Sequence, residues 1–189
     1  MTSIINLVKK YKIIITTALM SAIVVSVMVL IFVNIKENKF YQKAEKQIIE
    51  LSQNIIKSYQ IKPNFWGLST NEVINKKLYT NNMKVENNNL IGYFNNLVEI
   101  GADDNGNIVM PTEKHFVIAY KELTKKQCIG MLSQKFNKTF WLSVKKITIK
   151  NNSFSQDFAW GNNDFALPIS KANLRKTCVY DKNTVIMQF

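Results

Sequence analysis

The fold is decided near the start of the chain, where residues 13–33 read IIITTALMSAIVVSVMVLIFV. This run, Ile13–Val33, has 21 residues and no charged side chain. As an α-helix it would be about 30 Å long, which matches the hydrocarbon core of a bilayer. No Gly or Pro occurs before Pro63 and Gly67, so nothing in the sequence breaks the helix where the apolar run ends. We therefore expect a transmembrane helix over residues 13–35 that continues beyond the membrane.

Apolar residues after the membrane run recur at the spacing of a helix face. They are Phe40, Ala44, Ile48, Leu51, Ile55 and Tyr59, separated by steps of four, four, three, four and four. This spacing places them on one side of an α-helix. We expect residues 36–62 to form an amphipathic continuation of the membrane helix that is ended by Pro63. Its apolar side would pack against a globular domain formed by residues 63–189.

The distal residues predict a domain of the α+β class. Two capping-box patterns, Ser69 with Glu72 and Thr124 with Gln127, indicate the starts of helices. These helices are expected over Thr70–Leu78 and from Thr124 to about Phe136. Runs rich in β-branched and aromatic residues predict strands at Val98–Ile100, His115–Tyr120, Phe140–Ile149 and Thr184–Phe189. Residues 102–107 predict a turn, Asn151–Asn163 predicts a polar loop that carries Trp160, and Leu174–Val179 is ambiguous.

Residues 1–12 form a basic leader or cytoplasmic tail that contains Lys9, Lys10 and Lys12. A cleaved signal peptide is the alternative to a retained anchor. We favour the anchor, because the apolar run is too long and no small-residue cleavage pattern follows it. Lysines flank the run on both sides, so charge alone leaves the orientation undecided.

The chain has two cysteines, Cys128 and Cys178, both in the distal domain. An even pair suits a disulfide formed in an oxidising compartment, and two buried free thiols are the alternative. A disulfide would close a loop of about fifty residues and would stabilise the domain by about 4 kcal/mol. It would also place the N-terminus in the cytoplasm and the domain in the periplasm.

The chain is basic, with 25 Lys and Arg residues against 13 Asp and Glu and a net charge of +12. These charges lie along the whole chain, and no Lys-rich or Arg-rich cluster stands out. We interpret them as a solvated surface. Binding of nucleic acid or of anionic lipid is the alternative, supported by charge alone.

Residues that could perform chemistry are scarce. His115 is the single histidine, and with no second His or Cys/Asp cluster in the sequence nearby a structural role is expected. Asp103 and Asp104 lack the alternating oxygen ligands of a calcium loop, so we expect a solvated turn there. The sequence has no phosphate-binding loop and no nucleophile elbow. We expect no enzyme activity, catalytic residue, metal, cofactor or small-molecule substrate.

Four stretches, taken in chain order, carry a family resemblance. They are the leader with its apolar run and amphipathic continuation, the segment from Tyr59 through Phe65–Thr70 to Met83, the segment Tyr93–Ile100, and the set Phe116–Tyr120, Leu123-Thr124, Gln127-Cys128 and Leu132 with Cys178. Together they resemble the type IV pilins, specifically the type IVb group that includes toxin-coregulated and bundle-forming pilins. The resemblance covers nearly the whole chain. It implies a long helix packed on an antiparallel sheet with one disulfide.

The N-terminus departs from that family. Its pilins are cut by a dedicated peptidase after a Gly that precedes the apolar run, and they carry an acidic residue a few positions later. Aligning the apolar runs puts Lys12, followed by Ile13, at the Gly position and Thr17 near the acidic position. No Gly, Asp or Glu lies anywhere from Met1 to Val33. A carboxylate in lipid is costly and usually retained for function. The absence of both the Gly and the acidic residue predicts a chain that stays uncleaved or assembles poorly.

The resemblance implies a minor or divergent subunit of a type IV pilus, or of a related secretion, conjugation or adhesion apparatus. Its partners would be other pilin subunits and an inner-membrane assembly platform, contacted by helix packing. It would sit in the inner membrane as a single-pass protein, or in the pilus at the cell surface if processed. The alternative is a single-span envelope protein with an extracytoplasmic sensor or scaffold domain.

Overall fold

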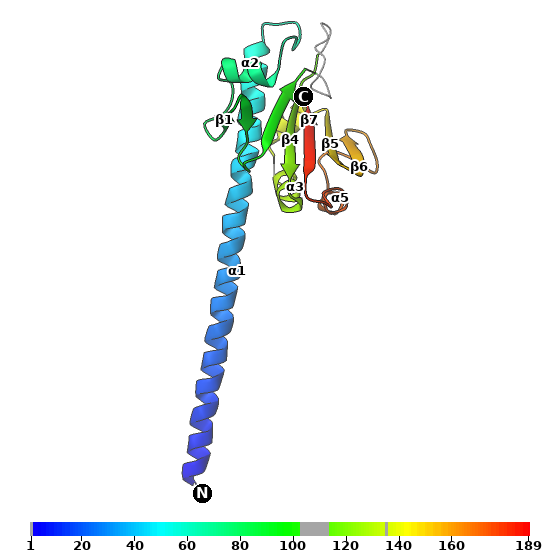
Figure 1. Cartoon of the computed structure of the whole chain (residues 1–189). Coiled ribbons are helices and arrows are strands. Elements are labelled where there is room, and N and C mark those ends of the chain that lie inside the picture. Colours follow the sequence, from blue (N-terminus) through cyan, green and yellow to red (C-terminus); the bar gives the residue numbers. More distant parts are fainter. Residues whose placement is uncertain (1, 103–113, 135) are drawn as a thin grey trace. The chain divides into compact units, whose positions relative to one another are not determined.

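The computed structural model describes residues 2–102, 114–134 and 136–189 (Figure 1). Its helices and strands, in chain order, are α1 (Thr2–Tyr59), α2 (Thr70–Asn75), β1 (Lys84–Glu86), β2 (Asn89–Ile91), β3 (Leu97–Gly101), β4 (Val117–Leu123), α3 (Lys125–Leu132), α4 (Lys138–Ser143), β5 (Lys146–Asn151), β6 (Phe154–Ala159), α5 (Lys171–Thr177) and β7 (Asn183–Gln188). The chain divides into two compact units, Met1–Phe40 and Tyr41–Phe189.

The first unit consists of the N-terminal part of α1. This helix contains one stretch that is long and apolar enough to cross a membrane, and none of that stretch is buried within the chain. Its large apolar side chains from Leu19 to Val33 are each between 48% and 66% exposed. The hydroxyl of Ser26 donates a hydrogen bond to the carbonyl of Ala22 at 2.7 Å, so this polar group is satisfied inside the helix. The apolar surface of this segment is thus left for lipid or for other helices to cover.

The second unit begins with Tyr41–Tyr59, the C-terminal part of α1. Ala44, Ile48, Leu51, Ile55 and Tyr59 are at most 3% exposed and belong to the main hydrophobic core, as the spacing in the sequence predicts. Phe40, the sixth member of the predicted stripe, is 41% exposed. Helix α1 ends at Tyr59, four residues before Pro63, which lacks a backbone N–H and disfavours helical geometry in the residue before it.

A seven-stranded antiparallel sheet provides the other side of the core. The strand order is β1-β2-β3-β4-β7-β5-β6, so the last strand of the chain lies between β4 and β5. In β4, Ile118 and Tyr120 face the main core, whereas Val117 and Ala119 share a small second cluster with Ile186 of β7. This alternation follows from the period of two along a strand. The predicted fold class, α+β with a long helix packed on an antiparallel sheet and one disulfide, is confirmed.

The predicted strand Phe140–Ile149 is wrong in its first half. Residues Lys138–Ser143 form helix α4, and strand β5 begins only at Lys146. The side chain of Asn137 accepts a hydrogen bond from the amide of Phe140 at 2.8 Å and so caps the helix. This local cap overrides the β-propensity of the aromatic residues that follow it.

The predicted loop Asn151–Asn163 is also wrong, because residues Phe154–Ala159 form strand β6 at the edge of the sheet. Only Phe158 is fully buried there, so the strand has little apolar signature. The ambiguous segment Leu174–Val179 lies mostly in helix α5, which is capped by Ser170. Helices α2 and α3 are shorter than predicted, ending at Asn75 and Leu132. Most of the predicted turn over residues 102–107, with Asp103 and Asp104, lies outside the described residues.

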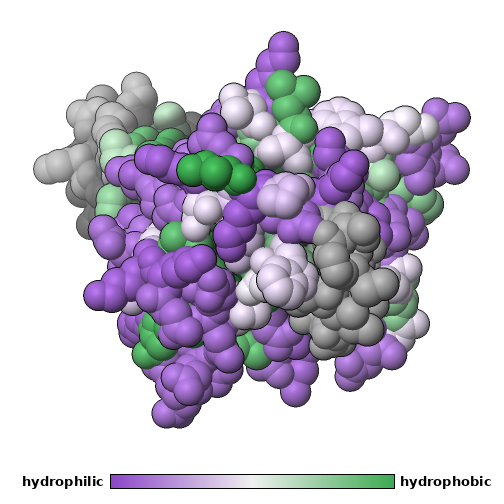
Figure 2. Space-filling model, turned by 90° about the horizontal axis from the view of Figure 1, so that it is seen from above, coloured by the Kyte–Doolittle hydropathy of each residue, from purple (hydrophilic) through white to green (hydrophobic). Residues whose placement is uncertain are grey.

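The surface seen from above the domain is mostly hydrophilic, with apolar residues in small separate groups (Figure 2). This distribution is that of a solvated domain surface, in contrast to the apolar run of the first unit.

Candidate functional site

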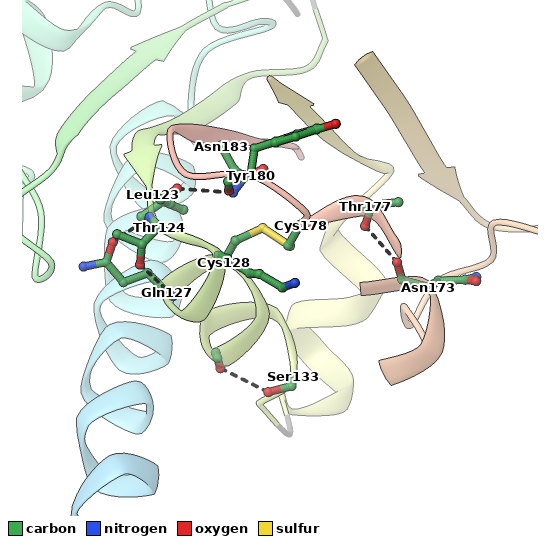
Figure 3. The surroundings of a disulfide bond; sticks show 12 residues. Leu123, Thr124, Gln127, Cys128, Ser133, Asn173, Thr177, Cys178, Tyr180 and Asn183 are labelled. Carbon is green, nitrogen blue, oxygen red and sulfur yellow. Dashed lines mark hydrogen bonds between the residues drawn. A yellow bond between two sulfur atoms is a disulfide. The ribbon is translucent and has the colours of Figure 1, made fainter. Parts of the chain in front are cut away.

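The cysteines predicted to pair do so, and the bond closes a region of the domain. Cys128 in α3 is bonded to Cys178, which caps α5, and their Cα atoms lie 5.9 Å apart at a sequence separation of 50 (Figure 3). Both residues are 0% exposed. The closed segment contains α4, β5, β6 and α5, and Cys178 directly follows the last of these elements. A loop of this length stabilises by about 4 kcal/mol on the chain-entropy model.

Hydrogen bonds near the disulfide connect the turn before α3 with the turn before β7 (Figure 3). Thr124 and Gln127 form the predicted capping box at the start of α3. The fully buried Asn183 donates to the carbonyls of Leu123, at 3.3 Å, and of Tyr180. The turn into α3 and the turn into β7 therefore form one hydrogen-bonded unit beside the disulfide.

Helix α3 approaches α1 closely at Gly130. A Cβ atom placed at Gly130 would lie 2.6 Å from Cδ1 of Tyr41, and closer still to other atoms of that ring. Tyr41 also packs against Phe94, with ring centroids 6.1 Å apart. Because Gly130 has no side chain, the ring of Tyr41 in α1 can pack directly against α3.

Gln47 is a buried polar residue of α1 that forms hydrogen bonds with two loops distant from it in sequence. Its side chain is 0% exposed. Nε2 donates to the carbonyl of Asn82 at 3.1 Å, and Oε1 accepts from the amide of Tyr93 at 3.0 Å. One side chain of the helix therefore fixes the loops on both sides of the β1–β2 hairpin.

The face of the sheet that bears Val117, Ala119 and Ile186 carries a shallow hollow of about 400 Å³. Its lining is mainly polar, and Lys121 forms an ion pair with Glu99 across it at 2.5 Å. Among the described residues that line it there is no Cys, His or Asp.

Of the other residues singled out in the sequence, His115, Lys12, Ile13 and Thr17 lie within the described residues, whereas Asp103 and Asp104 do not. Nδ1 of His115 lies 3.2 Å from the backbone oxygen of Phe189, so the ring links the start of β4 to the end of the chain. Within the described residues, no three His, Cys, Asp or Glu side chains come close enough to hold a metal ion. Lys12, Ile13 and Thr17 lie in α1. The link between these three positions and peptidase cleavage rests on the sequence comparison with pilins alone.

Two solved structures resemble this arrangement over most of the chain. One is TcpA, a type IV pilin from Vibrio cholerae El Tor, with a TM-score of 0.51 and 14% identity over 80% of this chain and 99% of TcpA. The chain has the type IV pilin fold. A type IVb pilin from Salmonella typhi matches with a TM-score of 0.50 and 13% identity, over 80% of this chain and 96% of that one. No protein-family model matches the sequence, and no curated protein is detectably similar to it.

Within this pilin fold, three features were predicted from the sequence. They are helix α1, which we call the stem, the capping box of α3 and the disulfide. It missed Gln47, because its polar side chain stands next to the apolar stripe and its partners lie 35 and 46 residues away. It also missed the contact at Gly130, where a glycine inside a helix was the available signal.

Proposed function

We propose that this protein is a type IVb pilin-like subunit, a minor or divergent component of a type IV pilus or of a related secretion, conjugation or adhesion apparatus. One observation carries the proposal. A pilin-fold domain closed by a disulfide continues directly into a helix whose apolar surface is uncovered in the isolated chain. Such a surface in a protein of this fold suits packing against the equivalent helices of other pilin subunits. The mechanism requires no covalent chemistry, and we infer that the protein is not an enzyme.

We propose further that the chain keeps its N-terminus as a single-pass inner-membrane anchor, with residues 1–12 cytoplasmic and Tyr41–Phe189 periplasmic. This proposal is supported by Lys12, Ile13 and Thr17, which stand where a pilin would have its cleavage Gly and its acidic residue. The buried pair Cys128–Cys178 supports an oxidising location for the domain. Its partners would then be other pilin subunits and the assembly platform in the same membrane.

N-terminal sequencing of the membrane-bound protein separates the two versions of this role. A chain that begins at Met1 or Thr2 supports the uncleaved anchor. A chain that begins at Ile13 overturns the anchor and supports a processed subunit that can leave the membrane for the filament.

The alternative function is a single-span envelope protein with a sensor or scaffold domain that shares the pilin fold. It is favoured if the domain is cytoplasmic or if the cysteines stay reduced in the cell. Labelling of the thiols after cells are quenched in acid and the protein is unfolded, with and without reduction, distinguishes the cases. Full protection that is lost only after reduction and unfolding fits the pilin-like subunit.

A further inference from the structure

Lysines occur along the whole domain, but its net positive charge is unevenly distributed. Residues 41–124 contain nine lysines and nine acidic residues, and so carry no net charge. Residues 125–189 contain eleven Lys and Arg residues against three Asp. The whole positive excess of the domain therefore lies in the half that contains the disulfide-closed region. An excess of positive charge in this half favours the attraction of a polyanion to it.

This basic half also contains an apolar groove of about 570 Å³. Its lining includes Phe136, Trp141, Trp160 and Ile169, and the ammonium-bearing side chains of Lys138 and Lys171 border it. Both lysines are exposed. Within the described part of the chain, neither lysine forms an ion pair with a carboxylate. Their charge is thus available to a ligand in the groove.

The two tryptophan rings are held in place while part of their surface stays accessible. Nε1 of Trp160 donates to the carbonyl of Val144 at 2.9 Å, yet the residue is 50% exposed. Trp141 is half-buried and contacts Phe136 and Phe140 edge-on, with centroids 5.5 and 5.6 Å apart. Rings fixed in this way lose little conformational entropy when a flat ligand stacks on them.

Accessible aromatic rings beside unpaired lysines match the chemistry of a single-stranded polynucleotide. Its unpaired bases stack on aromatic side chains, and its phosphates attract ammonium groups. A duplex keeps its bases stacked inside and would meet only the lysines. An acidic peptide would likewise use the lysines but has no need of the accessible parts of Trp141 and Trp160.

We propose that the groove formed by Trp141, Trp160, Lys138 and Lys171 binds single-stranded nucleic acid, with a base on Trp160 and flanking phosphates on the lysines. Nucleic-acid binding at this groove would be a function additional to the proposed pilin-like role, and it does not depend on that role.

Fluorescence anisotropy of a labelled oligothymidylate, titrated with the full-length protein in nonionic detergent, tests the proposal. We expect binding at low salt that weakens as NaCl rises. Trp160→Ala should raise the Kd about tenfold and leave the salt dependence unchanged, since it removes a stacking partner. Lys138→Ala with Lys171→Ala should lower the slope of log K against log salt by about 1.4, because each phosphate contact contributes about 0.7.

Matched controls lie in the neutral half of the domain. Trp66 is 60% exposed and lies outside the groove, so Trp66→Ala should bind like the parent. Lys57→Ala with Lys84→Ala removes two exposed lysines from that half and should leave the slope nearly unchanged. Circular dichroism and the urea midpoint verify that each variant is folded. If Trp160→Ala does not fold, the charge reversal of the exposed pair, Lys138→Glu with Lys171→Glu, must abolish binding.

Four results would overturn the proposal. They are no binding at low salt, equal binding by folded Trp160→Ala, unchanged binding by the charge-reversed pair, and equally tight binding of duplex DNA, polyphosphate or polyglutamate. The last result would show a surface that recognises charge alone.

Discussion

Gln47 tests whether α1 holds the domain by specific polar contacts as well as by its apolar face. Gln47→Ala removes the hydrogen bonds to Asn82 and Tyr93 and leaves a small cavity in a fully buried site. Each hydrogen bond contributes about 1 kcal/mol, and the lost methylene packing adds about 1 kcal/mol. We expect the free energy of unfolding to fall by about 2–4 kcal/mol, with the two loops loosened from the helix.

Urea unfolding of the full-length protein in nonionic detergent, followed by tryptophan fluorescence, measures this change. Gln53→Ala is the matched control, because Gln53 is the same residue type on the same helix but is exposed. Its effect should stay within about 0.5 kcal/mol. If Gln47→Ala and Gln53→Ala behave alike, the contacts of Gln47 contribute nothing and the reasoning is refuted.

Three further changes probe the disulfide, a close contact and a buried hydroxyl. Replacing Cys128 and Cys178 together by Ala should lower the free energy of unfolding by about 2–4 kcal/mol in the same titration, and a negligible loss would contradict the loop-closure argument. Gly130→Ala should destabilise by about 1–3 kcal/mol through its clash with Tyr41, although Ala is the better helix former. A more stable Gly130→Ala protein would disprove that contact. Tyr120→Phe removes a buried hydroxyl without a hydrogen-bond partner among the described residues, so its Tm should equal or exceed that of the parent. Burial also raises the pKa of Tyr120 above its ordinary value of 10.0. The folded state therefore favours the neutral phenol, and the parent should lose stability as the pH rises above 10, whereas Tyr120→Phe should lose less.

The stem and the disulfide could be predicted because their signals are local or compositional. An uncharged run of membrane length and a stripe at helical spacing each point to one structure. Thr124 and Gln127 are three residues apart, so the capping box at α3 could be predicted as well. Two cysteines allow one intramolecular pairing, and the fold brings them together.

The predicted secondary structure is wrong where a local helix cap or tertiary contacts determine the conformation. Phe140–Ser143 has the composition of a strand, yet Asn137 starts a helix there. Strand β6 is an edge strand that buries only Phe158 fully, so pairing with β5 rather than apolar alternation defines it. The groove beside Trp160 could not be foreseen, because its lining comes from segments separated along the chain and joined by folding. The net positive charge of residues 125–189 can be counted from the sequence. A single net charge for the whole domain does not reveal it.

The central claim is that the apolar stem packs against the stems of other pilin-type subunits. A photo-crosslinking amino acid placed at Val25, which is 59% exposed in the isolated chain, tests it directly in living cells. We expect cross-linked species in which the partner, identified by mass spectrometry, carries a pilin-type N-terminal helix. The same probe at the buried Ile48 of the domain should give no such product. Cross-links to lipid alone, or only to proteins without a pilin-type helix, would contradict the account.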